Sequence, residues 1–428
     1  MTAETAAVLA QPLSLPSEII RNRIVKAAMT EGLADAQGRA TPALERLYRL
    51  WGAGGAGLLI SGNVVVDMDH REKPGNVVIT PAIDAESRAA LKRVTQAARA
   101  DGAGFWMQVS HAGRQTPSLV NPRPKAPSAV AVALPGNHFG QPVALEASEI
   151  EELIERFAFA AEAARDVGFT GVQIHAAHGY LLSAFLSPRA NRREDEWGGS
   201  LENRARMLLE IVRRARARVG RDFTLSVKLN SADFQKGGFS PGESIAVADQ
   251  LAAAGVDVLE ISGGNYEQPR MADMEGAEKP DLSGLPASTA AREAYFLDFA
   301  VEMRKRVSIP LMVTGGFRTA SAMAQAIAQE GVALVGLARP MIIDADAPAK
   351  LLAGADELTR WENILRLGPG ILGPRSPIMM IKATNGFGAM SWYYQQIRRI
   401  GAGQAPDLKM GLLKAIGAEQ AAQKALLS

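Results

Sequence analysis

Short apolar runs rich in residues that favour β-strands recur eight times along the chain, and amphipathic stretches with helical spacing separate them. The apolar runs occupy residues 23–29, 57–62, 104–110, 171–176, 223–229, 256–262, 309–315 and 332–338. The amphipathic stretches occupy residues 42–51, 85–101, 147–167, 201–219, 242–254, 288–307 and 320–329. This alternation predicts eight consecutive strand–helix units.

Strands that are apolar along their whole length and are joined by helices are typical of a parallel sheet covered on both faces. Eight such units are the number at which a parallel sheet closes, so we predict an α/β protein with a (β/α)8 TIM barrel. An open, doubly wound sheet is the alternative, and it would carry a Gly-rich first turn. The first unit reads RIVKAAMTEGLAD and has no G-x-G-x-x-G pattern, which favours the barrel.

The barrel pattern accounts for residues 12–352 of the 428. Residues 353–428 leave the pattern and are predicted to form a C-terminal helical extension, with helical spacing clearest at residues 392–407. Two connections, at residues 113–146 and 263–286, are longer than a simple barrel needs. Both follow strands, so we expect them to cap the C-terminal face of the barrel, where such folds bind substrates.

Composition narrows the class of function. The formal net charge is +2 and the basic residues form no long runs, so we expect no nucleic-acid partner and favour a small-molecule substrate. There is no cysteine, which excludes disulfides, thiolate nucleophiles and cysteine-ligated zinc or iron–sulfur centres. No apolar run approaches the roughly 20 residues that span a bilayer, and the first residues do not resemble a secretion signal. We therefore expect a cytoplasmic protein with no membrane partner.

Polar side chains stand where several predicted strands end, which is where TIM barrels build their active sites. They are Thr30, Gln108, His111, His175, His178, Tyr180 and Lys228. The last two strands end in TGGFRT and GLARP, and the loops after these strands commonly bind phosphate in this fold. Gly315 and Gly316 would let backbone amides approach an anion, and Arg339 would add a charged fork. Ordinary turn glycines are the alternative interpretation.

The spacing His175-x-x-His178-x-Tyr180 has three interpretations. As metal ligands the histidines would need a further ligand, for which the acidic residues at 194–196 are candidates, but a strand-end loop lacks the helical spacing of H-E-x-x-H sites. As structural residues both would be hydrogen-bonded in the core. As a pair of donors they would stabilise a developing negative oxygen while the tyrosine delivers a proton. The third interpretation explains the tyrosine as well, and we favour it over a metal site.

The charged run that follows, SPRANRREDEWGGSLENR, is interpreted as structural, because a charge run is usually a solvated face. Ser200 is expected to cap a helix that begins near Leu201. Trp197 is followed by two glycines, which indicates a fixed and packed turn.

The segment IHAAHGYLLSAFLSPRANRREDEWGGSLENRARMLLEIV closely resembles the signature of the old yellow enzyme family, whose members are FMN-dependent NAD(P)H:flavin oxidoreductases on a (β/α)8 barrel. RNRIVKAAMT, FWMQVSHAGRQT, TGGFRT and GLARP agree with that family in the same order. The resemblance covers about residues 12–352 and implies FMN as cofactor and NADPH or NADH as reductant. Longer members with an iron–sulfur cluster and a second dinucleotide-binding domain do not fit the length or the absence of cysteine.

For the flavin ring, the resemblance implies that Thr30 hydrogen-bonds the O4 edge while the backbone at Ala28 and Met29 lies against the ring. Gln108 would bind the pyrimidine side, and Gly62 would contact the ring edge from the second strand. Many relatives have proline at the position of Ala28, and some have cysteine at that of Thr30. A redox-sensitive thiol is therefore not expected here.

Lys228 stands where the family commonly has arginine. A positive charge near flavin N1 and O2 is kept, but a point charge replaces a planar fork. The resemblance also implies a cradle for the FMN phosphate, made by Gly315, Gly316, Phe317, Ala338 and Arg339.

The implied reaction is the reduction of an α,β-unsaturated carbonyl compound, an enone-type small molecule. Hydride would pass from the flavin to Cβ, His175 and His178 would hold the carbonyl oxygen, and Tyr180 would protonate Cα. An FMN-dependent dehydrogenase or demethylase is the alternative within the family, and a metal-dependent barrel lyase or hydrolase is the alternative from another class. In some relatives a C-terminal segment reaches a neighbouring subunit, so residues 353–428 either support a homo-oligomer or pack onto the chain's own barrel.

Overall fold

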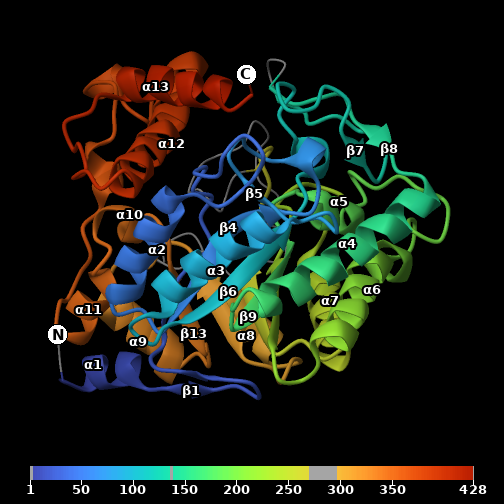
Figure 1. The fold of residues 1–428 in the computed structure, drawn as a ribbon, viewed down its shortest axis with the longest axis horizontal. Helices are drawn as coiled ribbons and strands as arrows, with labels where there is room; N and C mark the ends of the chain where they lie inside the picture. The colour runs from blue at the N-terminus through green and yellow to red at the C-terminus, as the bar shows by residue number, and fades with distance from the viewer. Residues whose placement is uncertain (1–2, 135–137, 269–295, 428) are drawn as a thin grey trace.

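Eight parallel strands form a closed ring in the computed structural model, which describes residues 3–134, 138–268 and 296–427 (Figure 1). Going round the ring, neighbouring strands are consecutive in the chain, and the ring closes where the first strand pairs with both the second and the last. The strands are β3 (Ile24–Lys26), β4 (Leu58–Val65), β6 (Gly104–Ser110), β9 (Gly171–Ala176), β10 (Thr224–Asn230), β11 (Val258–Ser262), β12 (Leu311–Thr314) and β13 (Leu334–Leu337). The predicted (β/α)8 barrel is confirmed.

Helices surround the barrel and bury one face each against its strands. They are α2 (Pro42–Ala53), α3 (Ala85–Arg99), α4 (Ala147–Asp166), α6 (Leu201–Val219), α7 (Pro241–Ala253), α8 (Leu297–Arg304) and α9 (Ala320–Ala328). Each lies within a predicted amphipathic stretch or extends it by one or two residues, because helical spacing reports burial on one face directly. Residues 288–295 of the stretch before α8 lie outside the described residues.

A feature that sequence periodicity did not predict closes the N-terminal end of the barrel. Helix α1 (Ala3–Ala10) leads into a hairpin of β1 (Leu13–Ser14) and β2 (Ile19–Ile20), seen at the bottom of Figure 1. Leu15 and Ile20 pack inside the ring with residues of the barrel strands, including Trp106 and Met312. Strands of two residues carry no periodic signal, so only the fold shows that this end is filled with apolar side chains. The polar residues of a site must therefore lie at the opposite end of the barrel, where the strands end; we call this end the mouth.

The charged run after β9 braces the outside of the barrel. It follows the short helix α5 (Leu181–Leu186), and Ser200 caps α6 as predicted by accepting a hydrogen bond from the amide of Asn203 at 3.2 Å. Arg204 is buried, donates to the carbonyl of Leu186, and pairs with Glu243 of α7 at 2.5 Å. Trp197 is buried, so the expected packed turn is present.

The C-terminal extension packs onto the chain's own barrel. After α10 (Pro340–Ile343) and α11 (Ala347–Leu352), two 3-10 turns at Trp361–Ile364 and Gly370–Leu372 precede α12 (Met379–Gly401) and α13 (Leu412–Ala425). In Figure 1 these last two helices lie above α2, at the end opposite the N-terminal hairpin. The guanidinium of Arg46 on α2 donates to the carbonyl of Gly401 at 2.7 Å.

The predicted helix at 392–407 is corrected in its limits. It begins at Met379 and ends at Gly401, and the chain then turns through Gly403, which has a φ of +76°.

Two further short strands, β7 (Lys125–Ala126) and β8 (Val143–Ala144), pair within the loop after β6, and β5 (Val77–Val78) lies beside β4. Among the helices that the structure describes, none combines the length and the apolar character needed to cross a membrane.

The cap at Ser200 gives a test of the local structure. Replacing Ser200 with Ala leaves the amide of Asn203 without its acceptor and is expected to lower the free energy of unfolding by about 1 kcal/mol. Ser200→Asp keeps an acceptor at the same place and serves as the matched control. Urea unfolding of the two variants measures the difference, and equal stability of both would show that the cap contributes nothing.

Candidate active site

Two histidines and a tyrosine meet where β9 ends, in the mouth of the barrel. The ring centroids of His175 and His178 are 5.0 Å apart, and those of His175 and Tyr180 are also 5.0 Å apart. His178 has a φ of +63°, which is unusual for a residue with a side chain, and its amide donates to Asn230 Oδ1 at 3.0 Å. This left-handed turn lets three side chains from a six-residue stretch face one another.

Both histidines are held in the neutral form. Burial lowers the pKa of His175 well below its usual value, and the neighbouring His178 and Lys228 lower it further; burial and Lys228 do the same for His178. Nδ1 of His175 accepts from the amide of Ala177 at 3.2 Å, so its Nε2 carries the hydrogen and is a donor. Burial also raises the pKa of Tyr180 well above its usual value, so this residue keeps its proton.

A chain of hydrogen bonds crosses the barrel interior below the histidines. Gln108 donates to Gln173 at 2.6 Å, and Gln173 donates to Glu260 at 2.9 Å. Lys228 pairs with Glu260 at 2.9 Å, and both side chains are almost fully buried. The predicted ring contacts Gln108 and Lys228 are therefore connected through two residues on β9 and β11 that the sequence did not single out. Their only sequence signal is that they are polar within apolar strands.

The residues after β3 line the same mouth. Ala28, Met29 and Thr30 are each half-buried there. Gly62 lies opposite them: a Cβ at this position would stand 2.4 Å from the carbonyl oxygen of Met29 and 2.8 Å from Cα of Thr30. Its amide donates to Glu31 at 2.9 Å, so any contact that Gly62 makes with a flavin does not use this N–H. The β4–β6 register shifts between Ile60 and Asn63, as expected for a bulge at a glycine.

The loops after β12 and β13 carry the residues predicted to bind the phosphate. Gly315 and Gly316 have φ values of +121° and +87°, which favour glycine. The amides of Gly315, Gly316 and Phe317 donate no hydrogen bond to any part of the chain that the structure describes. Arg339 is half-buried beside Ala338, and its guanidinium forms no hydrogen bond or ion pair with the residues that the structure describes. Free amides beside an unpaired guanidinium are the donor set that a phosphate group needs.

The mouth fits FMN on these observations. On one side of the mouth, unpaired backbone amides and the guanidinium of Arg339 are available for a phosphate. Toward the barrel centre lie the side-chain amide of Gln108 and the ammonium of Lys228, and the hydroxyl of Thr30 follows β3. The hydroxyl of Thr314 lies buried beside the cradle with no hydrogen-bond partner among the described residues. Thr30, Gln108 and Lys228 would hold the ring, and Gly315, Gly316, Phe317, Ala338 and Arg339 would hold the phosphate.

A carboxylate that the sequence did not predict also enters this mouth. Glu72, in the loop between β4 and β5, accepts hydrogen bonds from the hydroxyls of Thr30 and Tyr180. Tyr180 further contacts the hydroxyl of Tyr266 at 3.2 Å. The segment REKPGN carries no motif, and its one signal was its place after the second strand, on the face where the site was expected.

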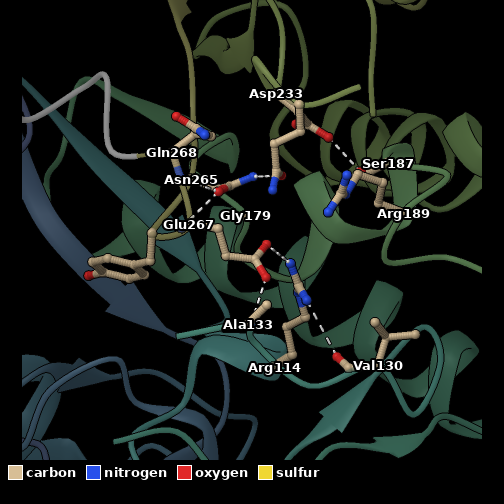
Figure 2. Close-up of polar contacts among 12 residues, drawn as sticks. Arg114, Val130, Ala133, Gly179, Ser187, Arg189, Asp233, Asn265, Glu267 and Gln268 are labelled. Carbon is tan, nitrogen blue, oxygen red and sulfur yellow. Dashed lines mark hydrogen bonds and ion pairs between the residues drawn. The ribbon is translucent and has the colours of Figure 1, made fainter. Parts of the chain in front are cut away.

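Two loops roof the mouth and bond to each other (Figure 2). Arg114, after β6, pairs with Glu267, after β11, at 2.6 Å, and both side chains are nearly buried. Glu267 also accepts from the amide of Ala133 at 2.7 Å. The two predicted caps thus meet over the site, and residues 269–286 of the second lie outside the described residues. Such a roof keeps water from the reacting atoms.

His111 does not join the histidine pair. Its ring stacks on His70 with centroids 4.3 Å apart, and its Nε2 lies 3.9 Å from Asp67. The three residues are close enough to ligate a metal, but Asp67 already accepts from His70 at 3.0 Å and lies 3.4 Å from Arg156. Burial acts to raise the pKa of Asp67, yet the hydrogen bond from His70 and the nearby His111 hold it well below its usual range. We interpret this group as a structural ion pair.

The acidic residues at 194–196, which the metal interpretation needed, lie away from the histidine pair. Asp195 is largely exposed and pairs with Arg193 at 2.5 Å. His178 has a protein partner in the hydroxyl of Ser262, at 2.7 Å. The geometry at His175 and His178 therefore favours hydrogen-bond donors over metal ligands.

Consecutive tyrosines on α12 are buried near charged residues of the barrel. Burial raises the pKa of Tyr393 to about 12, and the charge of Arg339 partly opposes this effect. Burial raises the pKa of Tyr394 well above its usual value, and Glu72 and Tyr266 add to the effect. The ring centre of Tyr394 lies 3.7 Å from the ammonium of Lys73, so the extension contacts the loop that carries Glu72.

Comparison with known proteins places these features in a family. The model of the NADH:flavin oxidoreductase / NADH oxidase family matches residues 8–357. The chain is 36% identical over 357 residues to the NADH-dependent flavin oxidoreductase iliE of Hypocrea jecorina, a match that covers 77% of this chain and 85% of that protein. It is also 36% identical over 354 residues to the protein of the same name from Neonectria sp., covering 78% of this chain but only 45% of that one.

Solved structures agree with the fold. The structure of the old yellow enzyme homologue from Zymomonas mobilis aligns with a TM-score of 0.68 and 27% sequence identity, covering 82% of this chain and 94% of that one. The aligned 82% of this chain is close to the share of the chain that the barrel occupies.

The neutral histidines predict a dependence of stability on pH. The folded protein holds His175 uncharged, whereas the unfolded chain takes up a proton below about pH 6.5, so the free energy of unfolding falls as the pH drops below that value. Between about pH 7 and about pH 5.5 this one residue accounts for about 1 kcal/mol, which His175→Asn is expected to remove. Urea unfolding with excess FMN at both pH values measures it, and an unchanged pH dependence in the variant would contradict the neutral state.

Proposed function

The chain belongs to the NADH:flavin oxidoreductase / NADH oxidase family, whose members are FMN-dependent oxidoreductases, and on that premise we propose that it is an ene-reductase. It would use NADH to reduce the carbon–carbon double bond of an α,β-unsaturated carbonyl compound. The observation that carries the proposal is the meeting of two neutral histidines and one protonated tyrosine at the barrel mouth.

His175 and His178 would bind the carbonyl oxygen of the substrate. A neutral imidazole donates a hydrogen bond without bringing a charge, and two such donors stabilise the oxygen as it becomes enolate-like. They are oriented before substrate arrives, because the turn at Ala177 and the hydroxyl of Ser262 fix their rings. A preoriented pair of donors needs little reorganisation during the reaction.

When bound, reduced FMN supplies the hydride that the Cβ atom of the substrate accepts. Tyr180 donates its hydroxyl proton to Cα, so the double bond gains one hydride and one proton and its π bond is lost. The tyrosine regains a proton afterwards from water. Tyr180 is buried, and the ion pair of Arg114 and Glu267 covers the mouth. Both would keep water from protonating Cα in place of Tyr180.

The positive charge of Lys228 would lie at the pyrimidine edge of the ring with Gln108. Thr30 would lie at the opposite edge, and its hydroxyl would have to turn away from Glu72 to donate to O4. Lys228 is paired with Glu260, so its charge is partly balanced before any cofactor binds. This differs from an unpaired arginine and tunes how strongly the site favours an anionic ring.

A second candidate is the reverse reaction, in which the same site dehydrogenates an amine or a related reduced substrate. The carboxylate of Glu72 at this mouth favours it, because a negative charge would attract a cationic amine. In the first candidate the substrate would oxidise the reduced flavin, and in the second it would reduce the oxidised flavin.

The test that separates them is a visible spectrum under anaerobic conditions. For an ene-reductase, we expect a flavin spectrum that bleaches with NADH and recovers on addition of cyclohexenone. Bleaching by an amine in the absence of NADH would support the second candidate instead. A protein that remains colourless after incubation with FMN would refute both.

Replacing Tyr180 with Phe tests the proton donor. The rate at which cyclohexenone reoxidises the enzyme is expected to fall by about 10²-fold or more, because general acid catalysis contributes this much. Reduction by NADH needs no proton from the tyrosine and should change little. Stopped-flow absorbance of the flavin measures both rates, and reoxidation by ferricyanide, which needs no proton, is the control. Equal losses in both half-reactions would show a structural effect rather than the loss of a proton donor.

A further inference from the structure

Four hydrogen-bond donors from separate parts of the chain converge on the carboxylate of Glu72. The hydroxyls of Thr30 and Tyr180 and the amide of Asn63 donate to it, and the amide of Asn76 does so at 3.3 Å. Thr30 follows β3 and Tyr180 follows β9, so this one carboxylate ties together two loops of the barrel mouth. Four donors match the accepting capacity of the two oxygens of one carboxylate.

The C-terminal helices hold the loop that carries Glu72. Lys73, the next residue, is buried, and its ammonium lies 2.5 Å from Glu419 on α13 and 3.7 Å from the ring centre of Tyr394 on α12. Glu419 is also buried and accepts from Gln395 at 2.8 Å and from Arg398 at 3.2 Å. Breaking such a pair is costly, since the remaining charge would be buried without a partner.

Backbone packing fixes the same loop from the other side. The carbonyl of Gly75 accepts from the amide of Ala34 at 2.9 Å, and Gly75 has a φ of +90°. A Cβ at Gly75 would stand 2.7 Å from the carbonyl oxygen of Gly32 and 3.1 Å from the side chain of Leu426. The loop is therefore enclosed by the segment after β3 and by the end of α13.

We propose that Glu72 is a positioning residue for Tyr180, and that the C-terminal extension sets its place through the buried Lys73–Glu419 ion pair. Before substrate binds, Glu72 accepts the hydroxyl hydrogen, which holds the phenol in place, and it holds Thr30 with the same group. The hydrogen bond to Glu72 then breaks as the proton passes from Tyr180 to Cα. The place of the proton donor is thereby set relative to the residue expected at the flavin edge. That Tyr180 is the proton donor rests on the proposed function, whereas the contacts of Glu72 do not.

Glu72→Gln tests the role of the carboxylate directly. The variant keeps the size of the side chain and the burial of Tyr180 but removes the negative charge. Glu72, Tyr266 and His175 are the titratable groups that face Tyr180, and both Glu72 and Tyr266 raise its pKa in addition to burial. We expect Tyr180 in the variant to ionise at a lower pH than in the wild-type protein.

The readout is ¹³C NMR of the FMN-loaded protein with labelled tyrosines, in which the signal of Tyr180 is assigned with Tyr180→Phe. Glu86→Gln is the matched control, because Glu86 is exposed on α3 and its ion-pair partner within the described part of the chain is Arg39. The kcat for cyclohexenone should fall about tenfold in Glu72→Gln, with the KM for NADH unchanged. An unchanged ionisation of Tyr180 would overturn the proposal.

The role of the extension is tested by the double variant Lys73→Met with Glu419→Gln, which removes both charges and leaves neither buried alone. It should shift the ionisation of Tyr180 in the same direction as Glu72→Gln. Adding Glu72→Gln to the pair should give no further shift, because the pair acts through Glu72. A full additive shift would show that the extension acts independently of Glu72.

The single variant Lys73→Arg keeps the positive charge. Tyr180 should ionise in it as in the wild-type protein if the ion pair is what matters. These spectra also separate the two proposals. A protein that does not reduce enones but still shows the Glu72-dependent shift would refute the ene-reductase and keep the positioning role. Enone reduction without a shift would refute the positioning role and keep the ene-reductase.

Discussion

The pairing of β3 with both β4 and β13 closes the sheet, and the active-site mouth depends on that closure. In a closed parallel barrel every strand ends at the same rim, so residues from distant parts of the chain meet there. Thr30, Tyr180 and Gly315 come to one mouth for this reason. The opposite end is filled by the N-terminal hairpin and its apolar side chains, so the polar groups share a single opening.

Burial then decides the chemistry of that opening. It keeps His175 and His178 uncharged and Tyr180 protonated, which turns three groups that could carry charge into neutral hydrogen-bond donors. Lys228 is paired with Glu260, and the carboxylate of Glu72 is held by several donors. The roof formed by Arg114 and Glu267 strengthens these interactions by excluding water.

The C-terminal helices contribute to the site itself. Tyr394 on α12 lies against the ammonium of Lys73, and Glu419 on α13 forms a buried ion pair with this lysine of the loop between β4 and β5. Residues 353–428 pack onto the chain's own barrel, which was one of the two interpretations of the sequence, and the homo-oligomer stays a prediction. The division of the chain at residues 352 and 353 remains a prediction, because α12 and α13 contact the barrel loop that carries Glu72.

The sequence by itself determined the parts whose signal is local. Apolar runs and helical spacing report the burial of one face directly, so the eight strands and the surrounding helices followed from them, as did the cap at Ser200. The stretch from His175 to Tyr180 and the glycines at 315 and 316 were also readable, because each lies at the end of a predicted strand.

Only the tertiary structure decided which side chains from distant segments meet. It directed His111 toward Asp67 and His70 rather than toward the histidine pair, and it brought Glu72 from an unremarked loop to Tyr180. It also linked Lys73 to Glu419, which lie far apart in the chain. Contacts of this kind depend on how strands close and loops fold over one another, and a single sequence carries no local periodicity that records them.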